Sequence, residues 1–175
     1  MDSKLFIAAL QCTVVLTNFL KLAHWGTRGM FAYPYHELFG KLYDEIAASL
    51  DELGELASIK GYAVNSEIFD KPTPIVTSSN PAELLNGALN LLDEYKDCLM
   101  TLVEAAEAQK ERGVVNSLDE LFTKIDIIQY LLEASLPADP AAAPQSISAK
   151  QIKKKKPPKE ISGEELESPS TQIID

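Results

Sequence analysis

Histidine, cysteine and tryptophan are scarce in this chain of 175 residues, which contains two, two and one of them. Glycine-rich phosphate loops of the GxGxxG and GxxxxGK(S/T) types are absent, and no nucleophile stands in a recognisable catalytic context with a histidine. These absences exclude the nucleotide-binding enzymes that use such loops and the common hydrolases that use a nucleophile and a histidine.

Two cysteines in a chain of this size do not make a disulfide framework. Cys12 and Cys98 both fall inside helical patterns, so we predict two buried thiols in a reducing compartment, the cytoplasm. The apolar stretch 5–22 is interrupted by polar residues and is followed by no small-residue cleavage site. We therefore expect a helix of the fold there, with no membrane span and no signal peptide.

Basic charge is also in short supply, since the net charge is −10 and the isoelectric point is near 4.7. Such a balance argues against a folded surface that binds nucleic acid by itself. Residues 1–136 carry the whole excess of acid, whereas residues 137–175 contain six lysines and six acids. The second region has no apolar face to bury, so the sequence predicts one folded domain, 1–136, and a disordered tail, 137–175.

Apolar residues recur at helical spacing in four segments of the domain. The predicted helices run from about 3 to 25, from about 35 to 60, from a cap at Asn80 to Gly113, and from a capping box at 117–120 to Pro137. The connection 61–79 contains two prolines and is far longer than a helical hairpin needs. The expected fold is all-α: a four-helix bundle with a long crossover between the second and third helices.

Both histidines lie close together at the corner between the first two predicted helices. His24 and His36 flank a glycine-containing turn, and Asp51 and Glu55 stand one turn apart further along the second helix. A rise of about 22 Å separates His36 from Asp51, which is too far for one ion in one chain. An antiparallel helix from a second copy would bring the histidines of one chain to the carboxylates of the other, and two-fold symmetry would make two equal sites.

These residues resemble a known family. The patterns His24-Trp25-(x3)-Gly29, His36-Glu37-Leu38-Phe39 and Asp51-(x3)-Glu55 are similar to the ferroxidase motif of the Dps proteins, the DNA-protecting mini-ferritins of starved bacterial cells. The similarity covers about residues 4–136.

The resemblance implies a ferritin-like four-helix bundle that assembles from two-fold dimers into a dodecamer and handles iron. It places His24, His36, Asp51 and Glu55 on the iron ligands shared between subunits, and Trp25 on the aromatic residue beside them. The family usually has an aspartate four residues after the second histidine, where this chain has Gly40. The Glu-x-x-His pair of the larger ferritins is absent.

Two functions from different classes follow. In the first, the protein is a ferroxidase and iron-storage shell that oxidises iron(II) and protects against oxidative damage. In the second, it is a non-catalytic structural or DNA-associated shell whose metal site has degenerated, as the loss of a carboxylate at Gly40 suggests. Without the resemblance, Asp51 and Glu55 would be interpreted as solvated surface charges.

The tail holds the strongest basic feature of the chain. Its lysine cluster is open to three interpretations: a solubilising segment, a tether for weak, sequence-independent DNA binding, or a signal that resembles those for nuclear import. The cluster consists of Lys150, Lys153, Lys154, Lys155, Lys156 and Lys159.

Overall fold

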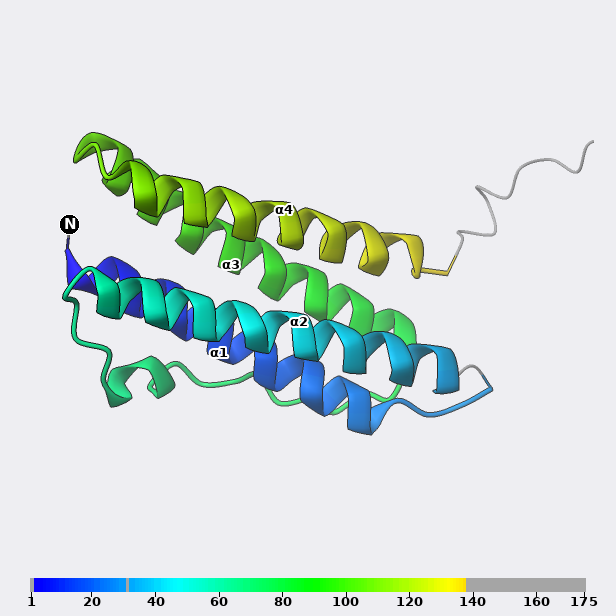
Figure 1. The fold of residues 1–175 in the computed structure, drawn as a ribbon. Coiled ribbons are helices and arrows are strands. Elements are labelled where there is room, and N and C mark those ends of the chain that lie inside the picture. Colours follow the sequence, from blue (N-terminus) through cyan, green and yellow to red (C-terminus); the bar gives the residue numbers. More distant parts are fainter. Residues whose placement is uncertain (1, 31, 138–175) are drawn as a thin grey trace, which may run out of the picture. The chain divides into compact units, whose positions relative to one another are not determined.

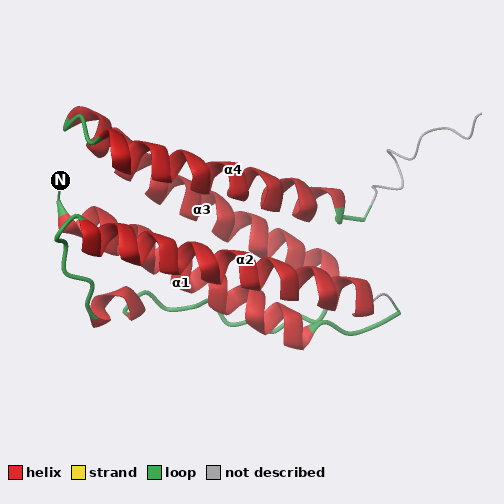
Figure 2. Cartoon of the chain, viewed as in Figure 1, coloured by secondary structure: helices red, strands yellow, loops and turns green. Residues whose placement is uncertain are grey.

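The computed structural model describes residues 2–30 and 32–137, and these form a bundle of four helices (Figure 1). The helices lie in two antiparallel pairs, and Figure 2 shows no strand in the described part of the chain. This confirms the all-α bundle with its crossover between the second and third helices, whereas the tail from 138 lies outside the described residues. In chain order the elements are α1 (Ser3–Gly26), α2 (Ala32–Ile59), the 3₁₀ helix η1 (Ser66–Phe69), α3 (Pro81–Ala108) and α4 (Arg112–Ala134).

Helix α1 is covered on more sides than the other helices. It packs on α2 and α3, and the crossover follows it in the same direction (Figure 1). Gln11 donates to the carbonyl of Glu67 at 2.7 Å, and Asn18 donates to Thr73 at 3.2 Å, so later residues of the crossover meet later residues of α1.

This covering explains the composition of α1, because a helix that is apolar all round must be buried all round. By length and composition alone, α1 is apolar enough to cross a membrane, but 61% of its most apolar window is buried inside the bundle. The predicted assignment of this stretch to the fold is therefore confirmed.

The core face of α2 is rotated slightly from the predicted one. Leu42, Ile46 and Leu53 are fully buried as expected. The outer members of the predicted stripe, Leu38, Leu50 and Leu56, are only half-buried. Residues that follow or precede them by one position take their place against the other helices, and these are Phe39, Ser49 and Ala57.

The predicted start of α3 is confirmed, and that of α4 is wrong. Asn80 caps α3 by accepting from the amide of Ala82 at 2.9 Å, and Pro81 follows at the first helical position. Helix α4 begins at Arg112, five residues before the predicted capping box, and Ser117 donates to the carbonyl of Gly113 inside the helix. Burial of Val114, one turn before the buried Leu118, extends the helix, because its contact with the core outweighs the capping signal.

The prediction of two separate buried thiols is also wrong. Cys12 of α1 and Cys98 of α3 are paired as a disulfide, although 86 residues separate them in the sequence. Cys12 is buried and Cys98 is half-buried. The inference of a reducing compartment from unpaired thiols loses its support.

Tyr95 is the largest polar side chain in the core. It is fully buried, and its hydroxyl group makes no well-formed hydrogen bond among the described residues. Burial raises the pKa of Tyr95 to about 12; the neighbouring Thr13 hydroxyl opposes the shift and the negative charge of Glu52 adds to it. The folded protein thus holds the phenolic proton more tightly than the unfolded chain, whose tyrosines ionise near pH 10.

We expect this difference to make stability fall at alkaline pH. The contribution of the protonated Tyr95 hydroxyl to the unfolding free energy is fully present below about pH 10 and is lost as the pH rises toward about 12. The loss amounts to about 2–3 kcal/mol. Urea unfolding of the wild type and of Tyr95→Phe at pH 9 and pH 11.5 measures it, and the variant should gain relative to the wild type at the higher pH. The exposed Tyr33→Phe is the control and should behave as the wild type. Parallel pH profiles for the wild type and Tyr95→Phe would contradict the assignment.

Candidate functional site

The two histidines meet where α1 ends and α2 begins. Their rings are stacked, with centroids 3.7 Å apart and planes inclined by 23°. Both histidine residues are half-buried.

Reciprocal hydrogen bonds hold this stack. His24 Nδ1 lies 2.7 Å from the carbonyl oxygen of His36, and His36 Nδ1 lies 2.8 Å from the carbonyl oxygen of His24. A carbonyl only accepts, so both Nδ1 atoms must carry a proton. In the neutral rings both Nε2 atoms then present a lone pair, which is the arrangement that metal-binding histidines have when a carbonyl fixes the other nitrogen. The carbonyl of His24 belongs to the last turn of α1, where helical partners run out.

Gly40 makes room for the His24 ring. The carbonyl of His36 lies inside α2 and points along the helix toward the residue four positions on, which is Gly40. A Cβ atom at Gly40 would lie 2.9 Å from both Cε1 and Nδ1 of His24. The ring therefore occupies the space in which the side chain of the family's usual aspartate would begin.

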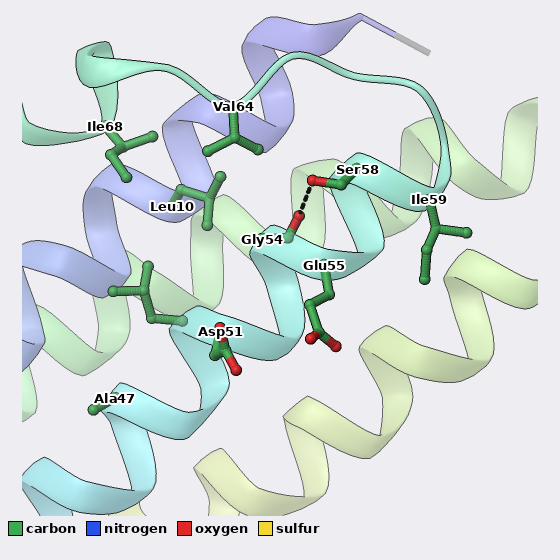
Figure 3. A pocket seen from close by; sticks show the side chains of 10 residues that line it. Leu10, Ala47, Asp51, Gly54, Glu55, Ser58, Ile59, Val64 and Ile68 are labelled. Atoms are coloured by element: carbon green, nitrogen blue, oxygen red, sulfur yellow. Dashed lines mark hydrogen bonds between the residues drawn. The ribbon is translucent and has the colours of Figure 1, made fainter.

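Asp51 and Glu55 lie near the other end of α2. Both are exposed and stand one turn apart on the same side of the helix (Figure 3). They border a groove of about 760 Å³ between α2, α1 and the segment that leads into η1. The rest of the lining is mostly apolar and includes Leu10, Ala47, Leu50, Ile59, Val64 and Ile68.

One chain thus brings the two histidines together but does not bring them to the two carboxylates. His36 and Asp51 are fifteen residues apart on one continuous helix, which corresponds to a rise of about 22 Å. Within residues 2–30 and 32–137, no group of three or more histidine, cysteine, aspartate or glutamate side chains is placed to hold a metal ion. The four-residue iron site stays a prediction.

The ammonium of Lys21 lies close to two aromatic rings, Trp25 and Tyr43, of which the sequence indicated only Trp25. Trp25 is 57% exposed, and the ammonium of Lys21 lies 5.4 Å from the centroid of its ring. The same ammonium lies 4.7 Å from the ring of Tyr43 and donates to its hydroxyl at 3.1 Å. Lys21 and Trp25 are one turn apart, so their spacing signalled this contact, but nothing in the sequence indicated Tyr43 as the second ring.

Gly40→Ala should displace the His24 ring, because the new methyl group would overlap it. We expect the hydrogen bond from His24 Nδ1 to the His36 carbonyl to be lost and the bundle to be destabilised by about 1–2 kcal/mol. A crystal structure of the variant and thermal unfolding measure the two effects. Gly113→Ala is the control, since a Cβ atom there meets nothing within 4 Å. An unmoved His24 ring in Gly40→Ala would show that Gly40 does not determine its position.

No protein-family model and no curated protein sequence matches the chain. Among solved structures, Dps from Thermosynechococcus elongatus is similar with a TM-score of 0.70 and 17% sequence identity, over 81% of this chain and 94% of that one. Dps from Listeria monocytogenes gives a TM-score of 0.67 at 20% identity, over 77% and 92% of the two chains. Dps92 from Deinococcus radiodurans gives 0.64 at 22% identity, over 80% and 90%. The described residues therefore have the four-helix fold of Dps proteins.

Proposed function

We propose that this protein is a Dps-like ferroxidase and iron-storage shell that oxidises iron(II) at sites shared between two subunits. The observation that carries the proposal is the reciprocal bonding of His24 and His36, which leaves both Nε2 atoms free to bind a metal. Imidazole nitrogens together with carboxylate oxygens suit iron(II) and other divalent first-row metals. The fold shared with the Dps structures supports this use of the pair.

The carboxylates of the proposed site come from a second copy. An antiparallel α2 sets the His24–His36 end of one chain against the Asp51–Glu55 end of the other, and the two-fold axis repeats the site. The apolar groove beside Asp51 and Glu55 supports contact with another chain there, since Ile59 is 79% exposed and Val64 is 38% exposed in the single subunit. Further assembly of such dimers gives the closed shell, a dodecamer.

The chemistry of the proposed site is electron transfer from iron to peroxide or oxygen. Two iron(II) ions give one electron each to hydrogen peroxide, which takes up two protons and becomes two water molecules. His24 and His36 hold iron through nitrogen, and Asp51 and Glu55 offer the harder oxygen ligands that iron(III) prefers. The resemblance to Dps proteins places Trp25 beside this site, and its ring and that of Tyr43 both lie close to the ammonium of Lys21.

Replacement of one ligand should slow the reaction without unfolding the bundle. We expect His36→Ala or Asp51→Ala to lower iron affinity and the oxidation rate by about 10–100-fold, since each removes one partner of the metal. Anaerobic titration with iron(II), followed by peroxide addition and measurement of ferric absorbance, tests this. Glu104→Ala, which removes an exposed carboxylate from α3, is the control.

Two results would contradict the proposed site. Light scattering that gave the monomer mass of 19.2 kDa at micromolar concentration would remove the second copy. A wild-type protein that assembles but oxidises iron no faster than buffer would favour the alternative function, a non-catalytic shell with a degenerate metal site.

The tail supports a second proposal, which is modest, sequence-independent DNA binding. The described bundle carries the acidic excess, so binding to phosphates must come from the lysine cluster at 150–159, which lies outside the described residues. Many copies on one shell would raise the apparent affinity through effective concentration.

Deletion of 150–159 should abolish this binding and leave iron oxidation unchanged. The wild-type shell should retard DNA in a gel at low salt, and the retardation should fall steeply as salt increases because each lysine–phosphate contact releases counterions. A shell that leaves DNA unretarded at every salt concentration would make the tail a solubilising segment or a docking segment for another protein.

A further inference from the structure

The cysteine pair lies away from the proposed iron site and has its own charged partner. Cys12 and His24 are twelve residues apart on α1, about 18 Å along the helix axis. The ammonium of Lys71, which comes from the crossover, lies 3.5 Å from the sulfur of Cys12. Chemistry at the pair is therefore separable from chemistry at the histidines.

Lys71 is held in this position from two sides. Its ammonium is 2.9 Å from a carboxylate oxygen of Glu94, which stands one turn before Cys98 on α3. Two residues further along the crossover, Thr73 accepts from Asn18 of α1. The contacts fix a half-buried cation, supplied by a third segment, at the junction of the two cysteine-bearing helices.

A cation at this distance favours the thiolate form of a cysteine over the thiol. Lys71 and Glu94 are the charged groups that the crossover and α3 place at the pair. The carboxylate bonds to the ammonium and offsets part of its charge, but the ammonium is the group in contact with sulfur. Reduced Cys12 is therefore the more nucleophilic member, and Cys98, half-buried beside it, is placed to resolve an oxidised sulfur.

We propose that Cys12 and Cys98 form a peroxide-reducing dithiol, with Lys71 as the residue that activates Cys12. The Cys12 thiolate attacks one oxygen of hydrogen peroxide; the O–O bond breaks, sulfur becomes sulfenic acid, and the leaving hydroxide takes a proton to form water. The Cys98 sulfur then attacks the sulfenic sulfur and forms the disulfide, and a second water leaves. One peroxide gains two electrons and two thiols lose them.

The burial of the pair limits the substrate to small peroxides. Cys12 is 5% exposed, so hydrogen peroxide, which is close to water in size, can reach sulfur where a bulky alkyl hydroperoxide cannot. A second turnover requires a small thiol reductant, which opens the disulfide by exchange and leaves as its own disulfide. This activity needs no iron and does not rest on the proposed function.

The first test counts thiols in the full-length protein. The protein is reduced with a dithiol, freed of reductant, treated with chelator and given one equivalent of hydrogen peroxide per chain. We expect two thiols to disappear per peroxide and a Cys12–Cys98 cross-linked peptide to appear in mass spectrometry. In Cys98→Ser, the Cys12 sulfenic acid should persist and be trapped by dimedone, whereas Cys12→Ser should react at least about tenfold more slowly. Cross-links between chains, or equal reactivity of the two single variants, would overturn the proposal.

The second test concerns Lys71. Lys71→Met should slow thiol oxidation at pH 7 about tenfold or more and move the midpoint of the pH–rate profile to higher pH. A nearby cation lowers the pKa of an acidic group by about one to three units, and the variant lacks this cation. Lys71→Arg should restore most of the rate because it keeps the charge. Lys96→Met is the control, as its ammonium binds Asp126 and Gln129 on α4. Circular dichroism confirms folding of each variant, and an unchanged pH–rate profile in folded Lys71→Met would overturn the role of Lys71.

Discussion

The hydrogen bonds between His24 and His36 join the last turn of α1 to the first turns of α2, and they depend on the missing side chain at Gly40. Each histidine ring donates a hydrogen bond to a backbone carbonyl of the other helix. The side chains that hold the α1–α2 junction together therefore also carry the Nε2 atoms that the proposed function uses. A Cβ atom at Gly40 would overlap the His24 ring and disturb this arrangement. Gly40, where the resemblance to Dps proteins predicts an aspartate, therefore makes room for the stacked imidazoles.

The straight course of α2 then determines what one subunit can do. With the histidines near its start and Asp51 and Glu55 near its end, no bending of a single helix brings the two pairs together. On the proposed function, each subunit supplies two complementary half-sites, and activity requires contact between copies. The exposed apolar lining of the groove beside the carboxylates fits that requirement, since burial against a second chain would remove it from water.

Much of the fold was predictable because the signals were local. Asn80 and Pro81 indicated the start of α3, and the helical period of apolar residues predicted the four helices. The length of 61–79 indicated a crossover. The start of α4 was missed because burial of Val114 outweighs a capping box.

The contacts that the sequence did not reveal all join residues far apart in the chain. The pairing of Cys12 with Cys98 depends on how α1 crosses α3, and the approach of Lys71 depends on the path of the crossover. For the site, spacing indicated that the two histidines are near each other. It did not indicate that Gly40 accommodates one of the rings, because a glycine in a sequence does not reveal which side chain fills the space beside it.

The crossover links the burial of α1 to the chemistry of its sulfur. The apolar helix α1 needs a segment over the face that α2 and α3 leave open, and the crossover that covers it brings Lys71 to Cys12. A half-buried ammonium requires partners, and here these are the Glu94 carboxylate and the sulfur. On the proposed dithiol chemistry, oxidation replaces an anionic sulfur with a neutral disulfide, so Lys71 loses one of its two negative partners. The contact of the crossover with α1 is then coupled to the redox state of the pair.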